Sequence, residues 1–211
     1  MKSLLKAVVS AVLVISSYGA VAQEAAGTFG VFDKNVGIVT QYDYNVIEGS
    51  GHYKKNTYAY IGLRQPSAYG TINIGAQRLT SHVDFTGPDE AAGWQIAYNY
   101  PYKFNGLIYS PSVQVGRVYG VEPFLTGKNL AVDYYKLGFD VIMPVSQTVA
   151  VFAAVARVTI TNTDLVSNSN RFTTGVDYFL TPTSSVRIGY SRQWSGKSTS
   201  NGITTGFVYN F

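Results

Sequence analysis

The chain ends in GFVYNF at residues 206–211, where Phe207, Tyr209 and Phe211 occupy alternate positions. Successive side chains of a β-strand point to opposite faces, so these three aromatic rings share one face. Most water-soluble domains end in a polar tail that frays. The aromatic ending therefore predicts a strand that the fold needs up to its last residue.

An alternation of large apolar residues with small or polar ones recurs along the whole chain. In the segment 93–100, every second residue is large and apolar, and the residues between them are Gln95, Ala97 and Asn99. This period of two predicts ten strands. Their approximate bounds are 36–44, 57–64, 70–80, 93–100, 112–119, 130–142, 148–160, 171–180, 185–194 and 202–211.

The pattern is less clear in three places. In 57–64, tyrosines share a face with an arginine, and in 148–160 the run AVFAAVA blurs the alternation. The stretch 103–119 is weakly patterned and contains Pro111, which cannot donate to a strand ladder. An eight-stranded arrangement is therefore the alternative to ten strands.

The connections between the predicted strands alternate between two kinds. Four are short and contain a proline that marks a turn, whereas five are longer and rich in Gly, Ser, Asn and Asp. This alternation predicts an antiparallel meander with tight turns at one end and longer loops at the other. The turn prolines are Pro66, Pro101, Pro144 and Pro182, and the loops are 45–55, 81–92, 120–129, 161–170 and 195–202.

The composition is rich in aromatic residues and poor in charge, with 17 Tyr, 11 Phe, 21 Gly and 13% charged residues. Cysteine is missing, which excludes disulfides, thiol nucleophiles and cysteine-ligated metal sites. The longest apolar run after the first 22 residues is 149–156, and a membrane-spanning helix needs about 20 residues. Lysines and arginines are scattered singly except for Lys54 and Lys55, so no nucleic-acid partner is predicted.

The first 22 residues have the features of a secretory signal peptide: two lysines, an apolar run at 7–15 and the small-residue end Ala20-Val21-Ala22. We expect cleavage before Gln23, and a retained N-terminal anchor is the alternative. Loss of two lysines leaves a net charge of about +2. The predicted organisation is a signal peptide at 1–22, an N-terminal periplasmic segment at 23–35 and a β-barrel at 36–211.

The two faces of the predicted strands suit a bilayer better than water. The apolar face is tipped with Tyr and Trp, and the other face carries mainly Gly, Ala, Gln, Asn, Thr and Ser. A secreted lipocalin-like barrel or a β-sandwich would need an apolar interior. In a bilayer, only a closed barrel pairs every backbone group of a sheet, and its apolar face contacts lipid. The aromatic residues expected at the membrane–water boundary are Tyr44, Tyr100, Tyr178 and Trp194.

With these features the chain resembles the small outer-membrane β-barrels of Gram-negative bacteria, and residues 175–211 are similar to the closing strands of porin-type barrels. The matching residues of the ending are Ile203, Thr205, Phe207, Tyr209 and Phe211. The resemblance implies a transmembrane antiparallel up-and-down β-barrel in the cell outer membrane, with an ending that the barrel-assembly machinery recognises. It also implies contact with outer-membrane lipid and lipopolysaccharide. Sixteen strands would need about twice this length, so a large trimeric porin is not expected and a monomer is favoured.

The inward face predicts both space and charge inside the barrel. Small residues would leave room along the axis, whereas opposite charges in a lumen of low dielectric constant are expected to pair as a polar network. We therefore expect a narrow, porin-like passive pore with small ion conductance and little passage of sugars. The alternative is a structural or surface-interaction barrel that contacts a partner or lipopolysaccharide without transport. The small inward residues are Gly37, Gly75, Ala97, Gly116, Gly138, Gly175, Gly189 and Gly206, and the network residues are Lys136, Asp140, Asp177 and Arg187.

Patterns for catalysis and metal binding are weak. His82 and Asp84 share a face of an extended segment, so with a nearby serine they would be the candidates for a hydrolytic site at the barrel rim. Their surroundings do not resemble the motifs of outer-membrane barrel enzymes, and no metal-ligand spacing is present, so no enzymatic activity, cofactor or metal is predicted. The other members of this loop group are Ser50, His52 and Ser81, and the loop cations that could pair with lipopolysaccharide phosphates are Lys54, Lys55, Lys128, Arg171 and Lys197.

Overall fold

The computed structural model describes residues 36–48, 53–67, 69–83, 87–121, 130–163, 167–195 and 198–211. The predicted signal peptide at 1–22 and the segment 23–35 lie outside these residues. The strands are β1 (Gly37–Glu48), β2 (Tyr53–Ser67), β3 (Gly70–Val83), β4 (Gly87–Asn99), β5 (Tyr102–Phe104), β6 (Leu107–Val121), β7 (Leu130–Pro144), β8 (Val149–Ile160), β9 (Ser169–Thr181), β10 (Ser184–Ser195) and β11 (Ser198–Asn210).

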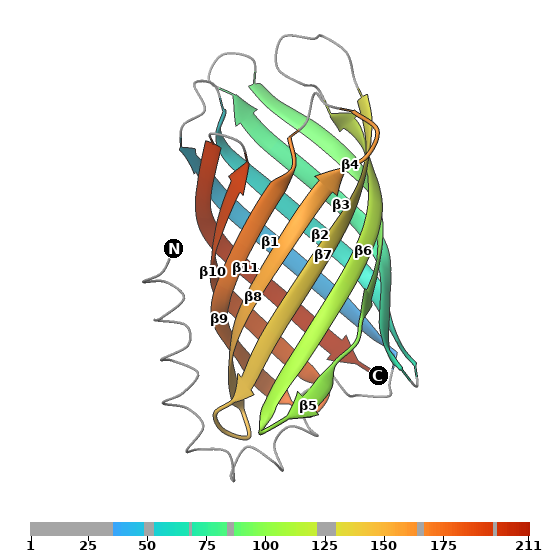
Figure 1. Cartoon of the computed structure of the whole chain (residues 1–211), viewed down its shortest axis with the longest axis vertical. Coiled ribbons are helices and arrows are strands. Elements are labelled where there is room, and N and C mark those ends of the chain that lie inside the picture. Colours follow the sequence, from blue (N-terminus) through green and yellow to red (C-terminus); the bar gives the residue numbers. More distant parts are fainter. Residues whose placement is uncertain are drawn as a thin grey trace.

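The strands form one closed antiparallel barrel (Figure 1). Neighbours in sequence pair with each other, β11 pairs with β1, and β4 pairs with β6. Closure leaves no open sheet edge, which is the condition for a sheet to cross a bilayer. The prediction of an all-β, ten-stranded barrel is confirmed, because the short β5 adds no separate strand to the wall.

The strand β5 continues β4, since both pair with β6. Between them, the Tyr100 amide donates to the Pro111 carbonyl at 2.9 Å. Pro101 and Pro111 have no backbone N–H group and so cannot donate hydrogen bonds to the neighbouring strand here. The wall is therefore interrupted at these prolines without losing a strand, which explains the weak pattern of this part of the sequence.

The turn of this hairpin lies at Asn105 and Gly106, at the end of the short connection predicted over residues 101–106. Both turn residues have positive φ, 49° and 78°, as a two-residue type I′ hairpin turn requires. Asn-Gly is the residue pair that adopts this turn at the lowest steric cost. The strand predicted at 112–119 consequently begins at Leu107.

The strands also extend further into the predicted loops than expected. β1 runs to Glu48, β2 begins at Tyr53, and only residues 196–197 join β10 to β11. Two strands joined by a polar hairpin continue to pair because each additional residue pair satisfies backbone N–H and C=O groups. The prediction of a loop at His82 is wrong for this reason: the residue lies in β3, opposite Pro88 of β4.

The side chains alternate as in a membrane barrel, with large apolar groups outside and polar groups inside. On β2, Ile61 and Leu63 are 58% and 59% exposed, whereas Tyr60 and Arg64 are buried. The ambiguous segment 57–64 therefore has its tyrosines and its arginine inside the barrel. The aromatic residues predicted at the membrane boundary are all exposed on the outer wall: Tyr44, Tyr100, Tyr178 and Trp194.

The two ends of the barrel differ, and we call them the turn end and the loop end. The turn end holds the short connections after β2, β5, β7 and β9, together with Val36 and Phe211, whose backbone groups hydrogen-bond at 3.0 Å. The strands β1 and β11 pair in register along their whole length. The aromatic last strand thus closes the barrel against the first, with Phe207 and Tyr209 exposed on the outer wall of the seam.

Candidate functional site in the lumen

One cavity of about 320 Å³ lies inside the barrel. Its lining comes from all ten strands of the wall, and most of the lining side chains are polar. None of the described inward residues nearer the loop end than Arg171 lines this cavity. The cavity therefore occupies the turn-end half of the lumen, and a layer of side chains bounds it toward the loop end.

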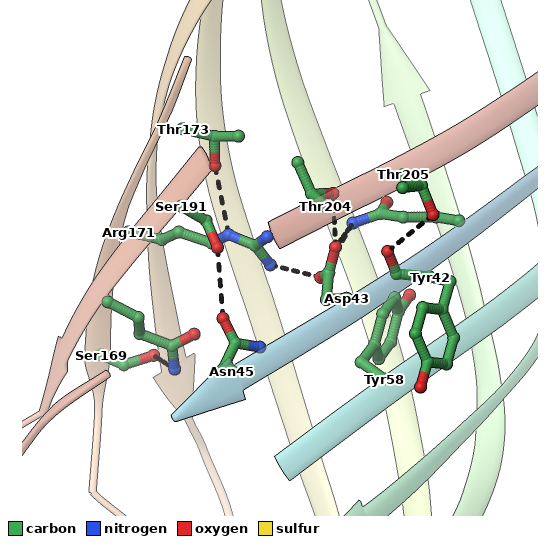
Figure 2. Close-up of polar contacts among 12 residues, drawn as sticks. Tyr42, Asp43, Asn45, Tyr58, Ser169, Arg171, Thr173, Ser191, Thr204 and Thr205 are labelled. Atoms are coloured by element: carbon green, nitrogen blue, oxygen red, sulfur yellow. Dashed lines mark hydrogen bonds and ion pairs between the residues drawn. The ribbon is translucent and has the colours of Figure 1, made fainter. Parts of the chain in front are cut away.

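Asp43 on β1 is fully enclosed within this bounding layer, with 0% of its surface exposed (Figure 2). Arg171 on β9 donates to its carboxylate at 2.6 Å, and the Gln41 amide donates to both oxygens at 3.1 and 3.0 Å. The Thr204 hydroxyl on β11 donates to it as well. A buried carboxylate is stable only when it is paired and hydrogen-bonded, and these donors therefore stabilise the charged form of Asp43 inside the barrel.

Arg171 reaches Asp43 across β10 and β11, where the inward residues are small. Ser191 on β10 is fully buried and donates to Asn45 Oδ1 at 3.2 Å (Figure 2). On β11, a Cβ at Gly202 would collide with Asn45. The prediction that Arg171 is a loop cation is wrong, because β9 begins two residues earlier, at Ser169, and its period of two puts residue 171 inside.

A second ion-pair group lies nearer the turn end. Arg187 on β10 forms a bidentate pair with Asp177 on β9, with Nε–Oδ1 and Nη2–Oδ2 distances of 2.7 and 2.8 Å. Its Nη1 atom also lies 3.8 Å from Asp140 Oδ2 on β7. The guanidinium carbon lies 4.0 Å from the centroid of the Phe152 ring. The fork geometry and the ring together hold Arg187 in place.

Lys136 is the fourth residue of the predicted network, and the structure does not join it to the other three by an ion pair. It lines the cavity from β7, four residues before Asp140. Within the described ranges, its ammonium group forms neither a hydrogen bond nor an ion pair. The cavity wall therefore carries a positive charge that is not within ion-pair distance of any described carboxylate.

Tyrosines and glutamines form a hydrogen-bonded group on the wall from β2 to β7. Tyr58 donates to Gln95 Oε1 at 2.9 Å, and the Gln114 amide donates to Gln95 Oε1 at 2.6 Å and to the Tyr134 hydroxyl oxygen at 2.8 Å. Tyr58 is directly opposite Asp43 in the sheet, so this group continues the layer that Asp43 and Arg171 begin. We call the six residues the closing layer: Asp43, Tyr58, Gln95, Gln114, Tyr134 and Arg171.

Several of the predicted inward glycines are covered by aromatic rings instead of opening the axis. A Cβ at Gly116 would lie 2.6 Å from the Tyr134 hydroxyl, and a Cβ at Gly75 would lie 2.7 Å from the Tyr60 ring. Aromatic side chains commonly cover strand glycines in this way. The open space lies instead beside Ala97, Gly138 and Gly206, which line the cavity.

Apolar side chains also enter the lumen near the turn end, which the alternation pattern does not predict. They form a buried cluster on β6 to β9 that includes Ile142, Phe152 and Phe179, and these three also line the cavity. The cavity is therefore apolar on one side and polar around the rest of its wall. The other members of the cluster are Ile108 and Ala150.

The remaining sequence candidates do not form a site within the described residues. No group of three His, Asp or Glu side chains in this part of the chain is placed to hold a metal ion. Nor does any described segment form a helix long and apolar enough to cross a membrane. Lys55 is exposed on β2, and the candidates outside the described residues are Ser50, His52, Asp84, Lys128 and Lys197.

Comparison of the sequence with protein families and with curated proteins gives no match. Among solved structures, the chain is similar to the β domain of the Bordetella autotransporter BrkA, with a TM-score of 0.55, 10% identity, and 85% of this chain and 100% of that chain covered. It is also similar to the translocator domain of the autotransporter NalP from Neisseria meningitidis (TM-score 0.51, 10% identity, 85% and 89% covered). An outer-membrane channel from Pseudomonas putida F1 gives a TM-score of 0.50 at 10% identity, with 85% and 96% covered. The chain thus has the fold of the outer-membrane β-barrel proteins.

Proposed function

We propose that the protein resides in the outer membrane and acts there as a narrow, porin-like passive pore. A closed wall with apolar groups outside supports a bilayer location, and the fold supports the outer membrane. In this proposal the turn end faces the periplasm and the loop end faces the outside of the cell. Lipid and lipopolysaccharide surround a monomeric barrel, and the barrel-assembly machinery recognises its last strand.

The observation that carries the pore proposal is the cavity of about 320 Å³ on the inside of the barrel, which is lined mostly by polar side chains. Side chains just fill a small barrel, and extra strands provide room for a channel or a ligand. Here most of the lining side chains are polar, and one of them is Lys136, which forms no ion pair within the described ranges. Such a lining favours water, small ions and small polar solutes over apolar molecules.

In this proposal the closing layer sets the width of the pore. Arg171 spans the lumen from β9 to Asp43 on β1, and the hydrogen-bonded tyrosines and glutamines narrow the remaining section. An ion therefore has to pass close to the guanidinium group of Arg171. We expect small conductance for ions and little passage of sugars, because pore selectivity follows the radius and the charge of the narrowest section.

Current measurements on the purified full-length protein in a planar lipid bilayer test the pore. We expect stepwise currents above those of the bare membrane. Lys136→Ala should shift the ion selectivity toward cations, because it removes a positive charge from the cavity wall. Absence of current from both the wild type and this variant, with both proteins folded, would reject the pore.

A second candidate function is a structural or surface-interaction barrel without transport. The observation that favours it is the dense packing of the loop-end half, where Asp43 and Ser191 have no exposed surface. A folded barrel that carries no current but binds a component outside the cell would support this candidate. We propose no enzymatic role.

A further inference from the structure

Two arginines on the outer wall have no partner among the residues that the structure describes. Arg157 on β8 and Arg192 on β10 are exposed near the loop end, and neither forms a hydrogen bond or an ion pair with any residue of the described ranges. The other two outward arginines are paired: Arg78 with Glu90 at 2.6 Å and Arg117 with Asp133 at 3.0 Å. The two arginines without a partner in the described ranges therefore lie close together, on the strands on either side of β9.

The sheet register brings this free pair together with two side-chain amides. Arg157 is opposite Asn170 of β9, and Arg192 is opposite Asn201 of β11. Only β9 separates the two arginines, which puts their Cα atoms roughly 12 Å apart. Two guanidinium groups at this separation can both donate to one anion that lies over the outer face of β9. Tyr190 donates to Asn201 Oδ1 at 2.7 Å, which leaves the amide N–H groups of Asn201 to a ligand.

The four residues lie where the apolar surface of the wall ends. Toward the turn end, the same strands expose Val155, Ile188 and Ile203. On either side of Arg192 along β10, Tyr190 and Trp194 are exposed, and such residues mark the headgroup level of a bilayer. The free guanidinium groups are therefore at the height of lipid headgroups.

Outward acidic residues do not neutralise this cluster within the described part of the wall. Asp133 on β7 is held by Arg117, and Glu48 on β1 is separated from Arg192 by β11. The net charge of the cluster is thus positive. An anionic ligand would compensate both guanidinium groups without displacing a protein partner.

We propose that Arg157, Asn170, Arg192 and Asn201 bind the phosphorylated headgroup of a membrane lipid in the leaflet at the loop end. Phosphate oxygens accept several N–H groups at once, and the arginine fork matches their geometry. The position beside the apolar wall fits an anion that is anchored by acyl chains better than a free ion. This lipid site is on the outside of the barrel and does not depend on the lumen being a pore.

Titration of the detergent-solubilised full-length protein with diphosphorylated lipid A tests the proposal, with bound lipid counted by native mass spectrometry. R157Q/R192Q should weaken binding about twentyfold, because two charge-assisted contacts are lost. R157K/R192K keeps the charge but loses the fork geometry, and it should give a smaller loss. The matched control R78Q/E90Q removes an outward arginine that already has a partner, and it should leave binding unchanged.

Equal binding by the wild type and R157Q/R192Q would overturn the proposal, provided that both show the same heat-modifiable migration of a folded barrel. Two further probes separate the sources of phosphate. Dephosphorylated lipid A and inorganic phosphate should each bind far more weakly than the phosphorylated lipid. If inorganic phosphate displaced the lipid at equal concentration, the site would be a free-anion site and the lipid assignment would be wrong.

Discussion

Arg171 and Asp43 are 128 positions apart in the sequence, yet the Nη1 atom of the arginine lies 2.6 Å from the Oδ2 atom of the aspartate. The contact joins β9 to β1 past the two intervening strands, β10 and β11. One ion pair therefore ties together both sides of the β1–β11 seam and crosses the lumen beside the cavity. Its removal should change both the stability of the barrel and the width of the lumen.

Asp43→Ala should lower the free energy of unfolding by about 3 kcal/mol, because it leaves the largely buried guanidinium of Arg171 without its counter-charge. Reversible urea unfolding of the protein in lipid vesicles, followed by tryptophan fluorescence, measures the change.

The double variant D43A/R171A checks that this loss comes from the pair. It should be less destabilising than the sum of the two single variants, because residues in one ion pair do not contribute additively. Strictly additive losses would show that the two side chains act separately.

Gly116→Ala should destabilise the barrel by about 1–3 kcal/mol, because its methyl group would lie 2.6 Å from the Tyr134 hydroxyl and 2.7 Å from the Trp94 carbonyl oxygen. Gly206→Ala is the matched control, since the nearest atoms there are at 3.2 and 3.6 Å. Thermal unfolding followed by gel migration compares the two variants. A larger loss at Gly206 than at Gly116 would contradict the role of aromatic rings in filling the glycine positions.

Much of this fold could be predicted from the sequence because lipid and lumen impose opposite demands on alternate residues. The alternation around Trp94 and Ile96 already identifies the outer face, and the aromatic ending at Phe207 and Tyr209 indicates the closing strand. The turn at Asn105 and Gly106 falls within the predicted connection 101–106, and Asn-Gly is the residue pair typical of a two-residue hairpin turn.

The closing layer could not be predicted in the same way. Period two places Asp43 on the inward face of its strand, but nothing local indicates which of the inward cations it meets. The pairing with Arg171 depends on the small size of Ser191 and Gly202 on two intervening strands, and hence on the register of the whole barrel. The inward position of aromatic rings such as Tyr134 is also hard to predict from the sequence, because an aromatic residue in a strand of a membrane barrel is expected to face lipid.

Cysteine labelling should report the orientation of the barrel, since the native chain contains no cysteine. Ser167→Cys, in the exposed connection between β8 and β9, should react with a membrane-impermeant maleimide on intact cells. Gln147→Cys, in the exposed turn between β7 and β8, should react only after the outer membrane is broken. The reverse pattern would mean that the turn end faces outward.

In the proposed function, the last strand is recognised during assembly and seals the edge of the barrel. Phe211→Ala should therefore reduce the amount of barrel assembled in the outer membrane while synthesis and export continue. Phe104→Ala is a matched control: both side chains are 61% exposed at the turn end, but Phe104 belongs to the β5 hairpin. Quantitative blotting of outer-membrane fractions measures assembly. Similar losses for the two variants would show that the loss of exposed aromatic surface, and not the position of Phe211 at the end of the last strand, reduces assembly.

Single-channel conductance of D43A/R171A in a planar bilayer tests most directly whether the Arg171–Asp43 pair limits a pore. The matched control is R117A/D133A, which removes an arginine–aspartate pair of 3.0 Å from the outer wall and leaves the lumen unchanged. We predict that D43A/R171A conducts at least about twofold more current than the wild type, because the guanidinium no longer crosses the narrowest section, and that the control conducts as the wild type does. Equal conductance of all three proteins, or no conductance from any of them, would contradict the account.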